Sequence, residues 1–367
     1  MRFRLIFILI IISNFCLAQK VKKEKVRKIK DTVYFVEYNS SIIAGYEGET
    51  KRMDLITEQY YVTDKDLFKN NALKSKSQML YRAEGDWSHG VALAFDKIGL
   101  SFGIGQNTQS ASDKIKKGST SFLSFGLSIG GNKWILEAKY RRHKGFYDAY
   151  TPNNDSAYYA RSGGVYYQQP SLTSDLYKLK FLYFTNHKKF AYKNCYSNSY
   201  RQTKTAASWV ITANAYYNTL TSDSTIIASP LKNYYENYSN LKGLNVFGCS
   251  VYAGVSVNLV IFKHLMWNGT LLIGPEYQNI NYNFNGAPSI YISKAGYSID
   301  WRSAIGFNYG KFFTFITGTY DITSIRNSSI NVVTDYYIIG FSMGLRIHVK
   351  YPKFYQKLQA TKLYQLL

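Results

Sequence analysis

The sequence is poor in cysteine and has no long uninterrupted apolar run. Only three of its 367 residues are cysteine, and the two beyond residue 19, Cys195 and Cys249, lie on distant segments. They form neither a disulfide framework nor a Cys/His metal site, so we expect no thiol chemistry, no bound metal and no cofactor. The best candidate for a spanning helix, Val251 to Phe262, is interrupted by Ser256 and Asn258. Its residues alternate between apolar and polar or small instead, as in a strand.

Acidic residues are also scarce. The chain has 23 Asp and Glu against 45 Lys and Arg, which gives a formal net charge of +22. A basic protein can bind nucleic acid, but an exported protein does not meet it routinely, so we expect no nucleic-acid partner. Solvated ends and loops are the favoured explanation of the charge. The alternative is attraction to anionic lipid head groups or to the phosphates of lipopolysaccharide.

Residues 1–19 have the parts of an export signal. Arg2 and Arg4 supply a positive start, Leu5 to Ile12 form a short apolar run, and Cys16-Leu17-Ala18 form a cleavage site. This pattern is typical of a secretory signal peptide. The basic residues 20–32 that follow are expected to form a periplasmic segment.

Beyond residue 90, segment after segment alternates large apolar residues with small or polar ones. Near residues 119–130, Leu123, Phe125, Leu127 and Ile129 share one face, and the Ser and Gly residues between them share the other. Side chains of a strand alternate between two faces, so this segment is a strand that is apolar on one side. About a dozen such segments, rich in Tyr and Phe, follow the export signal. The sequence therefore predicts an all-β protein, a transmembrane antiparallel β-barrel in the outer membrane.

Short turns and longer polar connections follow one another along the chain. Tight turns are expected near residues 97, 131, 187, 263 and 310, and strands on both sides of them, including one at 189–196. To keep the strands antiparallel, a further strand is needed near Ser224 to Ser229. The total becomes about 14 strands, with 12 to 16 open, in a barrel over residues 33–349. Residues 350–367 are expected to form a periplasmic tail.

Several short motifs occur in order along the chain. They are Asp31-Thr32-Val33-Tyr34, Lys117-Gly118-Ser119-Thr120, Lys144-Gly145-Phe146-Tyr147, Asn186-His187-Lys188-Lys189-Phe190-Ala191-Tyr192 and Gln202-Thr203-Lys204-Thr205-Ala206-Ala207-Ser208. In these the chain resembles an outer-membrane family of Bacteroidetes-type bacteria called domain of unknown function 4421 (DUF4421). The resemblance covers nearly the whole mature chain. It implies the location and the barrel architecture, and it supplies neither an activity nor catalytic residues.

Charged residues on the polar face of the strands are candidates for lining the lumen. They are Glu137, Lys139, Asp300, Arg302 and Arg346. Among many Gly and Ser residues, charges of both signs can either line a channel or pair into a packed interior. We slightly favour the packed, salt-bridged interior.

Basic residues at the expected outer rim are candidates for contacts with lipid head groups. Arg141, Arg142 and Lys144 can reach lipopolysaccharide phosphates. His143, between them, is a weak candidate for a general base in lipid modification. The turns that contain His187 and His264 show no metal-ligand spacing.

Two functions therefore stay open. The favoured one is a non-enzymatic barrel that is structural, or that binds or passes a small polar or anionic solute. The alternative is a membrane-embedded enzyme that modifies lipid or lipopolysaccharide. Expected partners are outer-membrane lipids, lipopolysaccharide and, during insertion, the barrel-assembly machinery. A soluble periplasmic β-sandwich is a third interpretation, and it would require the apolar strand faces to pack on each other.

Overall fold

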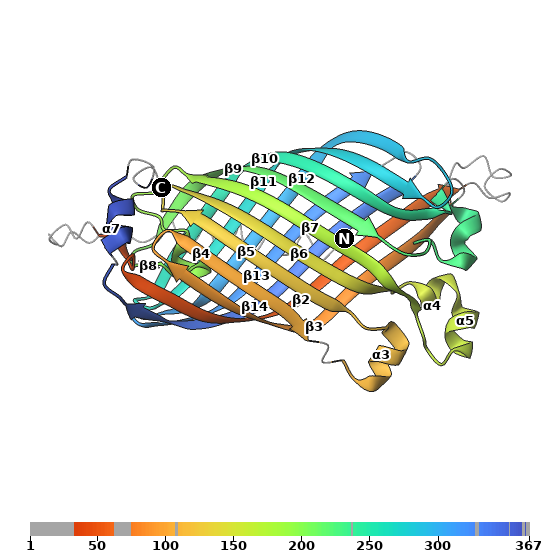
Figure 1. The fold of residues 1–367 in the computed structure, drawn as a ribbon, viewed down its shortest axis with the longest axis horizontal. Helices are drawn as coiled ribbons and strands as arrows, with labels where there is room; N and C mark the ends of the chain where they lie inside the picture. Colours follow the sequence, from red (N-terminus) through yellow and green to blue (C-terminus); the bar gives the residue numbers. More distant parts are fainter. Residues whose placement is uncertain are drawn as a thin grey trace, which may run out of the picture. The chain divides into compact units, whose positions relative to one another are not determined.

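The computed structural model describes residues 33–61, 75–106, 109–235, 238–326, 330–351, 353–361 and 364. The predicted signal peptide (1–19) and basic segment (20–32) lie outside these residues. Residues from Tyr34 onward form one compact unit, in which twelve antiparallel strands close into a barrel (Figure 1). In order around the barrel the strands are β10 (Leu241–Phe262), β11 (Leu265–Phe284), β12 (Ile290–Asn308), β13 (Phe312–Arg326), β14 (Ile330–His348), β2 (Ser41–Tyr61), β3 (Ser75–Phe95), β4 (Ile98–Gln106), β5 (Ser121–Gly130), β6 (Trp134–Asp148), β7 (Tyr167–Phe184) and β9 (Ala206–Thr221).

Two short strands are not part of the barrel sheet and pair with each other. They are β1 (Phe35–Glu37) and β8 (Tyr200–Gln202). The described part of the chain thus has fourteen strands, twelve of them in the barrel. The predicted all-β antiparallel barrel is confirmed, and its strand number lies within the predicted range. No helix in the described ranges is long and apolar enough to cross a membrane.

The barrel strands are long. β10 has 22 residues and β11 has 20, whereas about 9–11 tilted residues suffice to cross a bilayer. The first and last barrel strands, β2 and β14, pair along nearly their whole length. Ser41 lies opposite His348 at one end of the paired stretch, and Gln59 lies opposite Ile330 at the other. Strands of this length can form an apolar belt over one part of the barrel and extend beyond it.

The outer face carries that belt. Alternate residues along each strand face outward, and many of them are large, apolar and exposed: Val91, Leu93, Leu100, Phe102, Phe181, Ile211, Val251, Ile273, Phe307, Ile316, Ile339 and Leu345. By the same alternation, all five tryptophans of the sequence take outward positions: Trp87, Trp134, Trp209, Trp267 and Trp301. Trp209 is 64% exposed. An exposed apolar surface of this extent marks a face that contacts lipid or protein.

The two ends of the barrel differ in their connections. At one end, called the turn end here, the connections 96–97, 131–133, 263–264 and 309–311 are short, as predicted. At the other, the loop end, longer connections carry the helices α3 (Ala111–Lys117), α4 (Thr151–Asn154) and α5 (Ser156–Arg161). Figure 1 shows these helices at the end opposite α7 and β8.

Two strands expected from the sequence are wrong. Residues 189–196 form no barrel strand, because they fold into the lumen and include the short helix α6 (Lys193–Tyr196). The region near Ser224 to Ser229 is no strand either, and β9 pairs directly with β7 and β10. Both errors have one cause. The apolar residues Phe190 and Tyr192 are buried inside the barrel, where the sequence pattern suggested a lipid-facing strand. Once residues 189–196 are counted as a strand, a further strand near Ser224 to Ser229 is needed to keep the strands antiparallel.

The segment that enters the lumen at the turn end comprises residues 186–205 and is called the plug. Phe190 and Tyr192 of the plug contact the ring of Phe184, with centroids 5.8 and 4.9 Å apart. They belong to a buried cluster with Ile135, Val210, Tyr252 and Leu272 from four different barrel strands. Because the cluster joins side chains from β6, β9, β10 and β11, the plug fills the lumen at this end.

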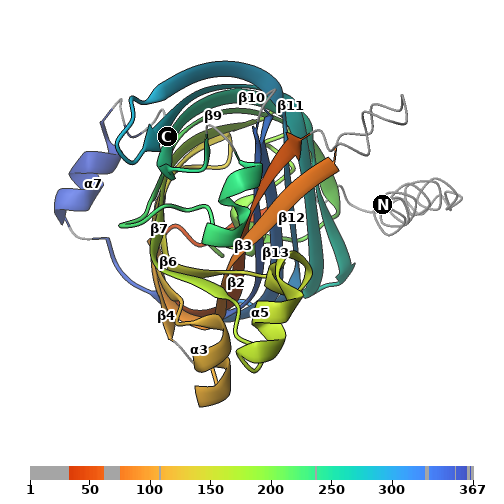
Figure 2. The ribbon, with the colours of Figure 1, turned by 90° about the vertical axis from the view of Figure 1, so that its right-hand side faces the viewer.

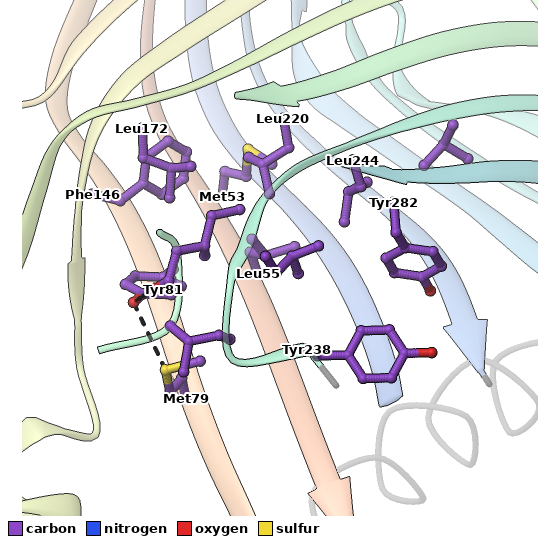
Figure 3. Close-up of a cluster of buried hydrophobic side chains, with 14 of the residues drawn as sticks. Met53, Leu55, Met79, Tyr81, Phe146, Leu172, Leu220, Tyr238, Leu244 and Tyr282 are labelled. Carbon is purple, nitrogen blue, oxygen red and sulfur yellow. Dashed lines mark hydrogen bonds between the residues drawn. The ribbon is translucent and has the colours of Figure 1, made fainter. Parts of the chain in front are cut away.

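The loop end is filled by the described residues, 222–235 and 238–240, of the connection between β9 and β10, which is called the cap. It contains the 3-10 helix η1 (Ser229–Tyr234), and it lies inside the ring of strands in Figure 2. In the cap Ile226, Ile227, Leu231 and Tyr235 are buried. They pack in the largest hydrophobic cluster of the barrel interior, which includes Met53, Leu55, Met79, Tyr81, Phe146, Leu172, Leu220, Leu244 and Tyr282 (Figure 3). The side-chain hydroxyl of Tyr81 donates to the carbonyl of Ile226.

The C-terminal segment is docked on the barrel. Helix α7 (Lys353–Gln359) lies at the turn end, where Tyr355 and Gln359 donate to Asp96 Oδ2, each at 3.2 Å. Lys97 Nζ donates to the carbonyl of Tyr364 at 3.0 Å. The predicted tail, residues 350–367, is therefore fastened to the β3–β4 turn through its described residues.

Candidate functional site

Charged side chains of both signs meet inside the barrel, between the plug and the cap. The structure brings together four of the predicted lumen residues. Arg302 on β12 donates from Nη1 to Glu137 Oε2 and from Nε to Asp300 Oδ1, both at 3.3 Å. Lys139 Nζ is 3.8 Å from Glu137 Oε2. Since β6 and β12 are not neighbours in the barrel, Arg302 bridges the lumen.

Lys180 completes this group and was missed in the sequence. It is buried and forms an ion pair with Asp300, and its register partner on β6 is Glu137. Its place between the outward residues Leu179 and Phe181 could have shown that it faces inward. Glu137, Lys139, Lys180, Asp300 and Arg302 are called the central ion network. Each of its two carboxylates contacts two of its three cations, as expected of buried charges.

The plug is tied to this network and to the barrel wall. Tyr192 OH accepts a hydrogen bond from Arg302 Nη1 at 2.8 Å, and Tyr196 OH donates to Asn268 Oδ1 at 2.8 Å. Asn308 Nδ2 donates to Asn194 Oδ1 at 3.1 Å. These bonds satisfy buried polar groups and fix the position of α6.

Arg346 faces inward and is separate from the central ion network. Its guanidinium donates to the carbonyl oxygens of Asn198 at 2.8 Å and Tyr309 at 2.7 Å, and to Asn308 Oδ1 at 2.7 Å. It also lies over the ring of Tyr38, 4.3 Å from its centroid. Arg346 therefore anchors the plug to the last strand instead of lining open space.

Lys193 is the buried cation of the plug. Its Nζ donates to the carbonyl oxygens of Lys97, at 3.2 Å, and Gly130, which belong to two turns of the turn end. Burial lowers the pKa of Lys193 to about 8. The thiol of Cys195, two residues later, has its pKa raised by burial, so it is not a reactive thiolate.

The lowered pKa of Lys193 predicts a pH dependence of stability. In the unfolded chain a lysine has a pKa of about 10.4. Between pH 8 and that value the unfolded chain therefore binds more protons at residue 193 than the folded protein does. Stability should therefore rise with pH in this window. We expect the free energy of unfolding of the protein to increase from pH 8 to pH 10 relative to Lys193→Met, in denaturant titrations. Parallel pH profiles of the two proteins would contradict this.

A cavity of about 220 Å³ lies beside the central ion network. The plug residues Tyr192, Lys193, Cys195 and Tyr196 line it on one side. Small residues of β4, β5 and β14 line much of the wall, among them Gly99, Ser101, Ser124, Gly126, Ser128, Gly340 and Ser342. Charged residues also line it, namely Glu47, Glu49, Glu137, Lys139, Arg141 and Arg302. Such a chamber can bind a small, charged solute.

The residues expected to contact lipid divide between the two faces of β6. Arg142 and Lys144 face outward, and Arg142 Nε forms an ion pair with Asp175 Oδ1 at 2.7 Å. Arg141 lines the cavity, on the face of β6 opposite to Arg142 and Lys144. The reason is strand alternation, which sends neighbouring residues to opposite faces.

His143 also faces inward. It is 3% exposed, and its ring lies 4.9 Å from the ring of Phe122 and 6.0 Å from that of Tyr336, by centroids. From this position it does not reach lipid at the outer surface, which removes the residue on which the enzymatic alternative depended. In the described ranges no group of three or more His, Cys, Asp or Glu residues could hold a metal ion.

Comparisons with known proteins give one family and several similar solved structures. The family described as "Domain of unknown function (DUF4421)" matches residues 30–346. No curated protein matches. Similar solved structures include the outer membrane protease OmpT from Escherichia coli (10% identity, 87% of this chain and 99% of that chain, TM-score 0.37). Another is Ail of Yersinia pestis (14% identity, 60% of this chain and 100% of that chain, TM-score 0.25). A third is LpxR from Salmonella typhimurium (10% identity, 80% of this chain and 99% of that chain, TM-score 0.30).

Proposed function

Since the chain belongs to the DUF4421 family, which carries no assigned activity, we propose a function from the barrel itself. The protein is a non-enzymatic outer-membrane barrel that binds a small polar or anionic solute inside a lumen filled at both ends. The observation that carries this proposal is the charged cavity of about 220 Å³, which lies in the same barrel as the plug and the cap. Passage of the solute would require one of these two segments to move.

The outer face supports the membrane location. The apolar belt suits a bilayer, whose hydrocarbon core meets every second residue of a barrel strand. Arg142 and Lys144, outward on β6, are suited to the phosphates of lipopolysaccharide at its edge. In this location the barrel-assembly machinery inserts the chain, and the docked α7 lies on the periplasmic side.

The tryptophans test the location. All five take outward positions on barrel strands, so brominated lipid should quench most of their fluorescence and aqueous acrylamide little of it. Trp209→Phe should remove a large part of the quenched emission, because Trp209 is the most exposed of them. Strong quenching by acrylamide with little quenching by brominated lipid would indicate a soluble protein.

Conductance tests the closed lumen. The refolded protein in a planar bilayer should give no steady single-channel steps, because buried side chains fill the lumen at both ends. A heat-modifiable gel band shows that the barrel is folded in the same preparation. Steady, ion-selective steps from the unmodified protein would overturn the proposal in favour of an open pore.

A further inference from the structure

The cavity wall between β3 and β6 is built of small residues. Gly126 on β5 lies directly opposite Ser101 on β4 and Lys139 on β6. A Cβ atom added to Gly126 would lie 2.5 Å from Ser101 Oγ, so even an alanine there would crowd the wall. With about 220 Å³, the space holds about seven water molecules, or a solute the size of an amino acid or dipeptide.

One side of the cavity is cationic. Lys139 and Arg141 are two residues apart on β6, so both point into the lumen. Arg141 makes no hydrogen bond or ion pair with any residue of the described ranges. Lys139 has a distant contact to Glu137, 3.8 Å, and that carboxylate is already bonded to Arg302. Two cations with unused donors beside Ser124 can bind a carboxylate.

The other side is acidic. Glu47 and Glu49 on β2 line the same cavity, and their register partners on β14, Ser342 and Gly340, line it too. Around the barrel, β2 and β6 are separated by β3, β4 and β5. The cavity therefore has a cationic wall and an acidic wall with a floor of small residues between them. A carboxylate accepts several hydrogen bonds at once, so each can receive a ligand ammonium in addition to other partners.

From this arrangement we propose that the cavity binds a small zwitterion of the amino-acid or short-peptide class. The ligand carboxylate lies at Lys139 and Arg141, and its ammonium lies toward Glu47 and Glu49. This assignment rests on the proposed function and specifies its solute. A simple anion would satisfy the cations but would face the two glutamates, and a simple cation would have the converse mismatch.

The test compares three probes with related skeletons. Alanine has both charged groups, propionate lacks the ammonium, and ethylamine lacks the carboxylate. Radiolabelled probes at millimolar concentration are dialysed against the refolded protein in detergent, and the measurement is repeated with the probe present during refolding. Alanine should bind saturably, and propionate and ethylamine should bind at least tenfold more weakly. Dialanine, measured alongside, reports whether the space also takes a dipeptide.

Variants locate the site. Arg141→Gln should weaken alanine binding by about ten- to one-hundred-fold, the usual effect of losing a hydrogen bond to a charged group. Glu47→Gln should reduce the preference for alanine over propionate. Lys144→Gln is the matched control, because it removes a neighbouring cation from the outward face of the same strand.

Four results would overturn the assignment. They are equal binding of propionate and alanine, equal loss in Lys144→Gln and Arg141→Gln, an unchanged preference in Glu47→Gln, and no saturable binding of alanine or dialanine in either format. The closed lumen, on which the proposed function depends, is tested separately by conductance. A barrel that is silent in bilayers and binds no zwitterion would support the closed lumen and overturn only the assignment of the ligand.

Discussion

Replacing residues 187–205 and residues 223–240 together by short Gly/Ser linkers should convert a silent barrel into an ion-conducting one. Neither replacement alone should do so, because the plug and the cap fill different ends of the lumen. The barrel should survive both changes. β7 and β9 pair with each other directly, as do β9 and β10, without either segment.

Planar-bilayer recordings of four proteins measure this effect: the unmodified protein, each single replacement and the double replacement. Steps should appear only in the double replacement. Charge reversal at Arg302 in that background should then shift ion selectivity, because the residue would border water. Steady conductance after one replacement would show that the other segment does not close the lumen.

Asp300→Ala should destabilise the protein by about 3–5 kcal/mol, the usual cost of breaking a buried ion pair. The substitution leaves two buried cations, Lys180 and Arg302, without their shared carboxylate. Urea unfolding of the barrel in lipid vesicles, followed by tryptophan fluorescence, measures the change. Asp300→Asn keeps the shape and some hydrogen bonding, and it supplies a value if the alanine variant does not fold.

Asp175→Ala is the control for this substitution. Asp175 also forms an ion pair, with Arg142, on the outer face, where the Arg142 side chain is 48% exposed and the Asp175 side chain 13%. Asp175 Oδ1 also accepts a hydrogen bond from Tyr140 OH at 2.7 Å. Its loss should cost about 1–2 kcal/mol, for one surface pair and one hydrogen bond. Equal losses in the two alanine variants would mean that the central ion network contributes no more than a surface pair.

The sequence predicted the barrel well because its signal is local. Alternation in a strand such as β5 needs only neighbouring residues, and it also placed Glu137, Asp300 and Arg302 on the inner face. The short turns near residues 97, 131, 263 and 310 depend equally on local residues, and all are found.

The plug and the cap could not be predicted in this way. An apolar side chain such as Phe190 has the same local pattern whether it contacts lipid outside or other side chains inside, and only the closed barrel decides which. The pairing of Lys180 with Asp300 likewise depends on strand positions far apart in sequence. The cavity is a property of many strands together, so its acidic wall at Glu47 and Glu49 gave no sequence signal.

The seam between β2 and β14 has a consequence for the order of folding. Ser40 and His348, whose side chains are 3.1 Å apart beside this seam, are 308 positions apart in the chain. Contacts between such distant residues form slowly, because a long loop must close first. The ring therefore cannot be complete until the last strand has been synthesised and delivered. Arg346, which fastens the plug, belongs to that same strand. A chain that stops before residue 330 would leave the ring unclosed and the plug without this anchor, so closure and locking are late, coupled steps of assembly.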